Sequence, residues 1–277
     1  MKKNTKHGIV VALRPEAAPL IRAWRLKKNI AHTAFEVFEN ETISLIVSGI
    51  GKIKSATAAT YLYTTGHLHT LWNFGICGAS DTTLDIGSFW RIHKITDVVS
   101  GRDYYPDGSI RLTMGESVLR TVDRPQENQC VGSADHALYD MEASGFFVAS
   151  TRFLPLERIH VLKIVSDHLQ IKGMTSDFIE NLTMQCLPKF SSCLDVLSAM
   201  RIDKETLSVN EQETMQHIFE MINPSHAQRI ALFDAARSYK IRNGYLPGDL
   251  MDMTQWAGEN KQERNARVER LRQKLIQ

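Results

Sequence analysis

Residues 7–13 read HGIVVAL, and this short run of apolar, mostly β-branched residues decides the fold class. Such a run is typical of a buried strand. Pro15 follows it, and proline is favoured at a helix start because its missing N–H would have no partner there. Residues 16–27 then place Ala17, Leu20, Ile21 and Trp24 on one helical face. The opening of the chain therefore predicts a buried strand followed by an amphipathic helix.

The same alternation continues along the chain as far as residue 200. Strands are predicted at 33–38, 42–48, 70–74, 87–99, 117–122 and 160–165, and helices at 53–65, from about 141, after the lead-in at 137–140, and at 176–200. Gly75 and Gly78 are expected to break the strand that begins at Thr70. Alternating strands and helices imply a sheet covered on both faces. We therefore expect an α/β domain over 1–200, a three-layer α/β/α arrangement around a central mixed twisted sheet.

Residues 201–277 contain only helical patterns, at 210–221, 225–240 and 259–277. This region predicts a C-terminal all-helical extension, and its last helix is rich in lysine and arginine. A basic face of this kind is typical of a solvated helix. Covering a pocket, forming an oligomer contact and binding a partner all remain open as its role.

Composition excludes several classes of function. The 277 residues carry a net charge of only +2, which does not favour nucleic acid as a partner. No apolar run reaches the roughly 18 residues that a membrane span requires. The four cysteines form no CxxC pair and no metal-binding spacing. We expect a cytoplasmic protein with reduced thiols, no metal and no membrane span.

Five segments place polar or glycine residues at predicted strand ends, where ligands bind in open α/β sheets. They are GIVVAL (8–13) with Glu16, SGIGK (48–52), NFGICG (73–78), DMEA (140–143) and IVSD (164–167). In sequence and order these segments resemble the purine nucleoside phosphorylase and nucleosidase superfamily, closest to methylthioadenosine/S-adenosylhomocysteine nucleosidase-like proteins. The resemblance covers about residues 7–200.

The resemblance implies hydrolysis of the N-glycosidic bond of a purine nucleoside, with adenine as the expected base, in a homodimer that needs no cofactor. Asp167 matches the acid that protonates the leaving base. Glu142 matches the carboxylate that binds the ribose hydroxyls, and Glu16 matches the residue that activates water. Further substrate contacts are expected from Leu13, Ile50, Ile76, Cys77, Gly78, Met141 and Ser166.

Each of these residues also has a purely structural interpretation. Aspartate is common at helix N-caps and in loops, which would suffice for Asp167. Glutamate is favoured in the first turn of a helix, which would suffice for Glu16 and Glu142. Met141 would then fill the core, and the glycines would allow close packing of helix on strand. A protein that binds nucleosides without turnover therefore remains an alternative, although all three acids are present.

The acceptor of the sugar is a separate question. A carboxylate such as Glu16 suits water and would repel a phosphate dianion, whereas phosphorylases of this superfamily surround phosphate with arginines. Residues 71–74 read LWNF and contain no arginine, which favours hydrolysis. Arg14 sits near the same loop, however, and would be able to meet an anion. Phosphorolysis is therefore kept as the alternative reaction.

Two segments depart from the family pattern. Ile76 and Cys77 stand where relatives usually carry small or hydroxylated residues, which predicts a more apolar pocket. Residues 123–139 are shorter than in the methylthioadenosine enzymes and lack the aromatic residue that stacks on the base. The loop expected at 102–107 contains two tyrosines and is an alternative source of an aromatic wall. These departures favour a branch that acts on adenosyl groups attached to larger intermediates.

Overall fold

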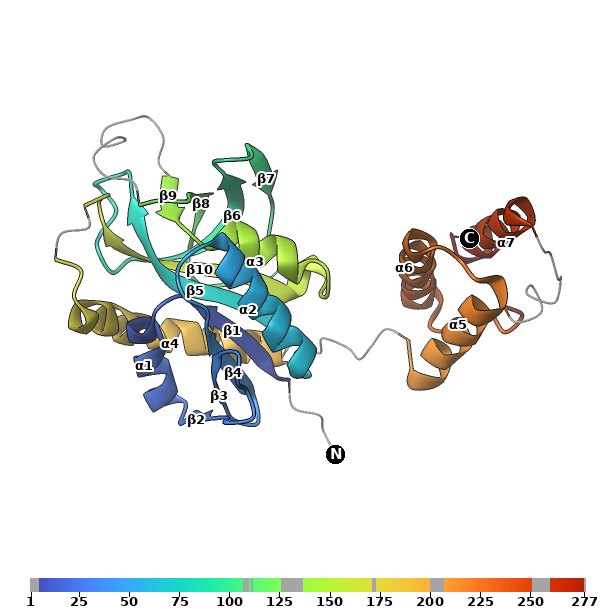
Figure 1. Cartoon of the computed structure of the whole chain (residues 1–277), viewed down its shortest axis with the longest axis horizontal. Coiled ribbons are helices and arrows are strands. Elements are labelled where there is room, and N and C mark those ends of the chain that lie inside the picture. Colours follow the sequence, from blue (N-terminus) through green and yellow to red (C-terminus); the bar gives the residue numbers. More distant parts are fainter. Residues whose placement is uncertain are drawn as a thin grey trace. The chain divides into compact units, whose positions relative to one another are not determined.

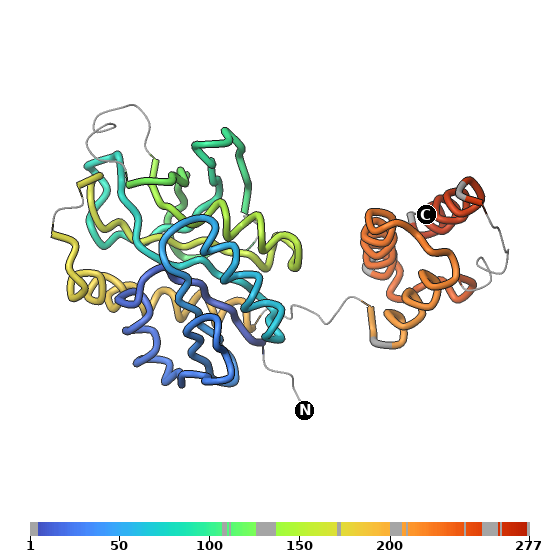
Figure 2. Tube along the Cα trace, viewed as in Figure 1, coloured from blue at the N-terminus to red at the C-terminus, as the bar shows by residue number. Residues whose placement is uncertain are grey.

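The computed structural model describes residues 5–106, 110, 112–125, 137–170, 173–199, 207–250 and 260–276. The chain divides into two compact units, residues 1–199 and residues 200–277 (Figures 1 and 2). No described helix is long and apolar enough to cross a bilayer.

The first unit is built on one large mixed sheet, as the sequence predicted. Its strands are β1 (His7–Val11), β2 (Lys27–Lys28), β3 (Glu36–Glu39), β4 (Ile43–Val47), β5 (Thr70–Ala79), β6 (Phe89–Asp97), β7 (Arg102–Tyr104), β8 (Gly115–Thr121), β9 (Ala137–Asp140) and β10 (Ile159–Asp167). Its helices are α1 (Arg14–Ala23), α2 (Lys52–Thr65), α3 (Ala143–Ser150) and α4 (Ser176–Ala199), with a 3-10 turn η1 (Leu156–Arg158).

Strand β5 is the centre of this sheet. It pairs in parallel with β1 along its first half and with β10 along most of its length, and it pairs antiparallel with β9 at its end. Because β10 also pairs with β6, β6 with β8 and β8 with β9, five strands close into a ring of pairings. Strands β1, β4, β3 and β2 extend the sheet beyond this ring.

One edge of β5 is left unpaired over a few residues, and this gap leaves backbone groups of β5 available to the site. The pairing with β1 ends at Asn73, and the pairing with β9 begins at Gly78. Backbone N–H groups between these two points need partners from outside the sheet. Strand β9 runs back along the end of β5, so that the residues after Asp140 return towards this gap.

Helices cover the sheet on both sides, as expected for a layered α/β fold (Figure 1). Helix α1 packs beside α4, and helix α2 packs beside α3. Phe190 of α4 stacks on Phe74 of β5 with the ring centroids 4.7 Å apart, and it also meets Trp24 after α1 at 5.4 Å. Aromatic burial of this kind contributes strongly to core stability. It fixes α4 on the sheet next to the strand that ends at Asp167.

The structure corrects three predictions about local structure. Strand β5 continues through Gly75 and Gly78 instead of breaking there, because both glycines make room for neighbouring side chains. The segment predicted as a loop at 102–107 begins with strand β7, in which Tyr104 pairs with Ile95. The first helix is also shorter than predicted, because α1 ends at Ala23 and Lys27–Lys28 form β2.

Among the described residues of the second unit, the regular elements are helices, as the fold prediction stated. It comprises α5 (Val209–Ile222), α6 (His226–Asn243) and α7 (Lys261–Ile276). Ser208 and Ser225 cap α5 and α6, each accepting a hydrogen bond from the backbone three residues on. A core of its own is formed by Leu207, Met215, Ile218, Phe219, Ile222, Leu232, Ala236, Leu250, Val268, Leu271 and Leu275. Amphipathic helices thus bury their apolar faces against one another within this unit.

Candidate active site

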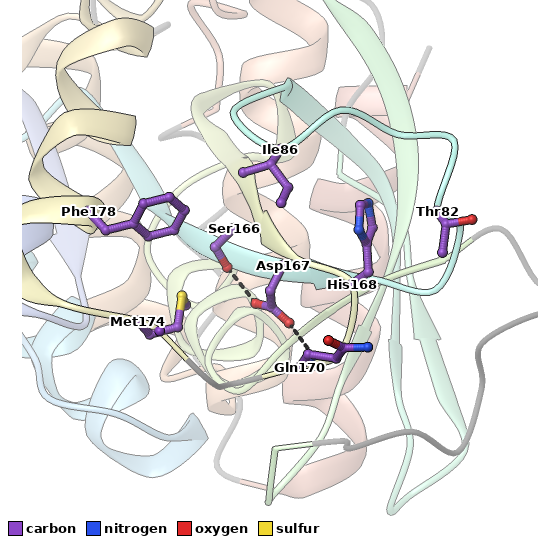
Figure 3. Close-up of a pocket in the computed structure, with 9 residues that line it drawn as sticks. Thr82, Ile86, Ser166, Asp167, His168, Gln170, Met174 and Phe178 are labelled. Carbon is purple, nitrogen blue, oxygen red and sulfur yellow. Dashed lines mark hydrogen bonds between the residues drawn. The ribbon is translucent and has the colours of Figure 1, made fainter.

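A cavity of about 400 Å³ opens at the end of β10, and Asp167 and Ser166 line it (Figure 3). Its other lining residues are Thr82, Ile86, His168, Gln170, Gly173, Met174 and Phe178. Phe178 comes from the first turns of α4, and Ile86 comes from the segment that follows β5. The cavity therefore combines one carboxyl group with an apolar and aromatic wall, a combination typical of small-molecule sites.

Hydrogen bonds hold the carboxyl group of Asp167 in place. Ser166 Oγ lies 2.7 Å from Asp167 Oδ2, and the backbone N–H of Gln170 donates to Asp167 Oδ1 over 3.0 Å (Figure 3). Asp167 lies opposite Gly78 of β5, where an ideal Cβ would be 3.4 Å from Asp167 Oδ1. Glycine at this position leaves the carboxyl group room against the neighbouring strand.

Glu16 is buried at the unpaired edge of β5. Its Oε2 accepts the backbone N–H groups of Ala12 and Leu13 at 2.9 and 2.8 Å, and its Oε1 accepts the N–H of Ile76 at 2.9 Å. Burial raises the pKa of Glu16, against the lowering effect of these hydrogen bonds and of the Lys163 charge. Each carboxylate oxygen has two acceptor positions, so Oε1 keeps one for a further donor.

Glu142 is buried at the N-cap of α3. Its Oε1 accepts the backbone N–H of Gly51, at the start of α2, over 2.9 Å. Burial raises the pKa of Glu142 to about 7, and the negative charges of Asp140 and Glu16 act in the same direction. The contact requires α2 and α3 to approach closely. Gly145 permits this approach, since an ideal Cβ at this position would lie only 2.2 Å from the Lys52 carbonyl oxygen.

A buried ion pair that the sequence analysis missed lies among these acids. Lys163 Nζ is 2.8 Å from Asp140 Oδ2, and the two side chains are 1% and 0% exposed. The positive charge of Lys163 lowers the pKa of both Glu16 and Glu142. A lysine inside an otherwise apolar strand, VLKIV, was the signal that would have identified it, because an unpaired buried charge is very costly.

The remaining predicted substrate contacts fall into different positions. Leu13 and Ile76 supply N–H groups to Glu16, and Met141 packs against the small cluster that contains Leu169. Cys77 is buried in the main core, where burial raises the pKa of its thiol. Ile50 is largely exposed. Of the ten predicted site residues, Ser166 and Asp167 line the cavity, whereas Glu16 and Glu142 lie outside its lining.

The aromatic side chain in the cavity differs from the expected one. Tyr104 packs against Phe147 of α3, and Tyr105 is exposed, so neither lines the cavity. Phe178 stands in the wall instead. Much of the shortened segment at 123–139 lies outside the described residues.

Arg14, the cation noted beside Glu16, is engaged elsewhere. Its guanidinium stacks over the Phe38 ring at 4.5 Å from the centroid and lies 3.9 Å from Glu36 Oε2. Lys52 is also paired, with Asp97 at 2.9 Å and with Asp123 at 2.8 Å. Within the described part of the chain, no three His, Cys, Asp or Glu side chains are grouped to hold a metal ion.

Fold and site together define an α/β protein with a ligand-sized cavity at Asp167 and a cluster of buried carboxyl groups in the same unit. The family model described as the phosphorylase superfamily matches residues 6–119. This match confirms the resemblance that the sequence motifs indicated. No curated protein matches the sequence.

Solved structures of nucleosidases share the fold at low sequence identity. A methylthioadenosine/S-adenosylhomocysteine nucleosidase from Helicobacter pylori, solved with butyl-thio-DADMe-Immucillin-A, has a TM-score of 0.59 and 19% identity, covering 69% of this chain and 98% of its own. The Colwellia psychrerythraea nucleosidase, in complex with adenine, has a TM-score of 0.60 and 18% identity over 70% and 96%. Futalosine hydrolase from Helicobacter pylori has a TM-score of 0.58 and 18% identity over 69% and 97%.

Proposed function

We propose that residues 1–199 form a hydrolase that cleaves the N-glycosidic bond of a purine nucleoside, most simply an adenosyl nucleoside. The observation that carries this proposal is the position of Asp167, a carboxyl group held by two hydrogen bonds at the wall of a ligand-sized cavity. Two further carboxyl groups, those of Glu16 and Glu142, are buried shortly after the ends of β1 and β9. The match to the phosphorylase superfamily and the shared nucleosidase fold support the same class of reaction.

In this reaction Asp167 is the general acid. As the bond between the anomeric carbon and the purine nitrogen breaks, its electron pair passes to the purine, which would leave as an anion without help. Asp167 donates a proton to the purine and so stabilises the departing base. General acid catalysis of this kind contributes about 10²- to 10⁴-fold to the rate. Phe178 and Met174 provide an apolar wall beside the acid, suited to a flat purine ring.

Glu142 and Glu16 act on the sugar side. The developing ribosyl cation is stabilised by the negative charge of Glu142, which also accepts hydrogen bonds from the ribose hydroxyl groups. Water forms the new bond to the anomeric carbon and gives a proton to Glu16. Burial raises the pKa of Glu16, which makes its carboxylate a stronger base towards that proton.

Water is a better acceptor than phosphate in this environment. Glu16 and Glu142 would repel a phosphate dianion, and two cations that the structure describes in this unit are already paired. Arg14 lies against Phe38 and Glu36, and Lys163 is bound to Asp140. The acid cluster therefore favours hydrolysis over phosphorolysis.

The test is a panel of adenosine, methylthioadenosine and adenosyl nucleosides with larger 5′ substituents, assayed for release of adenine with and without inorganic phosphate. Free sugar as the product supports the proposal, whereas sugar 1-phosphate formed only with phosphate would establish a phosphorylase. Adenine binding by calorimetry without release from any nucleoside would instead establish a binding protein.

The active form is a homodimer in this proposal, located in the cytoplasm. Exposed apolar side chains flank the Lys52–Asp97 ion pair: Ile53, 83% exposed, follows Lys52, and Val98 and Val99 follow Asp97. Exposed apolar groups in such proximity commonly mark protein interfaces. Sedimentation analysis of the wild type and Ile53→Glu tests this, because the charged variant is expected to be monomeric. A monomeric wild type would contradict it.

A further inference from the structure

The buried ion pair between Lys163 and Asp140 has no role in the reaction proposed above. Both side chains are at most 1% exposed, and their charged atoms lie 2.8 Å apart. A buried lysine and a buried aspartate must each be compensated, since charges in a low-dielectric interior are strongly disfavoured. Hydrophobic side chains would fill the same space, so the pair requires an explanation.

The strand register places Lys163 on the same face as Glu16. Lys163 of β10 lies opposite Gly75 of β5 in a parallel pairing, and paired residues direct their side chains to the same face. The missing Cβ of Gly75 would point at Glu16 Oε1, 2.7 Å away. Lys163 therefore leaves the sheet on the face that carries the Glu16 carboxylate.

Asp140 is held by four polar contacts with groups of the protein. Its Oδ1 accepts the Thr121 hydroxyl at 2.7 Å, and its Oδ2 accepts the backbone N–H groups of Ala143 and Glu142 at 2.8 and 3.2 Å, in addition to Lys163. These bonds fix the first turn of α3, the helix that Glu142 caps. The ion pair thus joins β10, the strand that ends at Asp167, to the start of α3.

Resting on the function proposed above, we propose that the Lys163–Asp140 ion pair is a positioning element: Asp140 holds the start of α3 and with it Glu142, and the charge of Lys163 favours the ionised forms of Glu142 and Glu16 for the reaction. Neither residue of the pair touches the substrate. Lys163 supplies a buried positive charge among three buried carboxyl groups, and Asp140 anchors that charge and the helix start together.

The charges around Glu142 act in opposite directions. Lys163 on β10 lowers its pKa, whereas Asp140 on β9 and Glu16 on α1 raise it. From β5, Cys77 faces the same cluster with a thiol whose pKa is raised by burial. Helix α2 contributes the uncharged Gly51 N–H, and its Lys52 is paired with Asp97 and Asp123. Removing Lys163 and removing Asp140 should therefore shift the pKa of Glu142 in opposite directions.

The experiment compares Lys163→Met, Asp140→Asn, the double variant and Lys163→Arg. The titration of Glu142 is followed by carbon NMR of protein labelled at the glutamate carboxyl carbon and assigned with Glu142→Gln, beside the pH profile of kcat/KM. Lys163→Met should raise the pKa of Glu142 by about one unit or more, and Asp140→Asn should lower it similarly. The double variant should titrate between them, and Lys163→Arg should match the wild type.

An unchanged Glu142 titration in all variants would overturn the inference. If Lys163→Met does not fold, the comparison of Asp140→Asn with the double variant still isolates the lysine, and equal titration of the two would be equally decisive against it. The NMR signal does not depend on turnover. A wild type that releases no adenine would therefore contradict the proposed reaction separately.

Discussion

The Glu16 carboxylate occupies the space that a side chain at residue 75 would fill. An ideal Cβ on Gly75 would lie 2.7 Å from Glu16 Oε1, closer than real Cβ contacts allow. The carboxylate cannot simply move aside, because three backbone N–H groups, those of Ala12, Leu13 and Ile76, hold it. The glycine in the middle of β5 is therefore part of how the base is positioned.

Replacing Gly75 with alanine is expected to displace Glu16 and to lower kcat/KM by roughly 10- to 100-fold, because small misplacements of catalytic groups cost about this much. Steady-state kinetics and thermal unfolding of the variant measure the effect. Gly66→Ala is the matched control, since its Cβ would lie 3.0 Å from the Leu62 carbonyl oxygen at the end of α2. Equal activity losses in both variants would contradict the positioning role of Gly75.

Asp167→Asn removes the proposed general acid while keeping its shape. We expect kcat to fall by about 10²- to 10⁴-fold with little change in stability, since an amide cannot give up a proton to the base. Asp195→Asn, on the exposed side of α4, controls for the loss of one negative charge. Wild-type turnover in Asp167→Asn would show that another group protonates the base.

Glu142 should make the first unit less stable as the pH rises. Burial raises its pKa to about 7, so the folded protein holds a proton that the unfolded chain has already lost near pH 4.5. The stabilisation is complete below the unfolded pKa and is lost as the pH rises through the folded pKa. Glu142→Gln should remove roughly 3 kcal/mol of the difference in unfolding free energy between pH 4 and pH 8. Urea titrations measure this, with exposed Glu157→Gln as control.

His7 should make the first unit less stable as the pH falls, which is the opposite of the effect of Glu142. Burial, aided by the charge of His69, lowers its pKa to about 4, and its ring nitrogens lie 2.7 Å from Thr70 Oγ1 and 2.9 Å from Ser198 Oγ. The unfolded chain takes up a proton near pH 6.5, so this stabilisation is lost as the pH falls from 6.5 towards 4. His7→Gln should flatten the acid side of the stability profile, whereas exposed His67→Gln should not. An unchanged profile in His7→Gln would contradict its depressed pKa.

Gly145→Ala should separate α3 from α2. Its Cβ would lie 2.2 Å from the Lys52 carbonyl oxygen, so the helices must move apart, at a cost of about 1–3 kcal/mol in unfolding free energy. The same shift lengthens the Gly51–Glu142 hydrogen bond and should lower activity. Val148→Ala, one turn later on the outer side of α3, is the control for a changed helix surface. A fully stable and active Gly145→Ala would show that the helices have room.

The sequence was sufficient for the layered α/β fold because apolar strands and helices alternate with regular spacing over 7–200. It failed at β5, where Gly75 and Gly78 resembled a turn. Glycine is needed at these positions because the side chains of Glu16 and Leu169, which are distant in sequence, occupy the space that a Cβ would fill. No local sequence pattern contains that information. The ring of strands was also hidden, because it depends on which strands pair and not on which residues form strands.

The same distinction applies to the candidate site. Asp167 and Ser166 were predicted from a local motif, and they line the cavity. Lys163 was overlooked because a single lysine in an apolar strand acquires meaning only beside Asp140, which is supplied by a different strand. Phe178 falls within the helix predicted at 176–200, and its place in the cavity wall became visible only with the fold.

Each of the two units closes a separate hydrophobic core, and this has a calorimetric consequence. The apolar side chains of α5, α6 and α7 are buried against one another, including Phe219, Leu232 and Leu271. Heat should then be absorbed in two endotherms, one for each core, and a cavity-forming change such as Leu271→Ala should shift only one of them. A destabilising substitution in the helical unit is therefore expected to leave the first unit, which carries the proposed active site, folded.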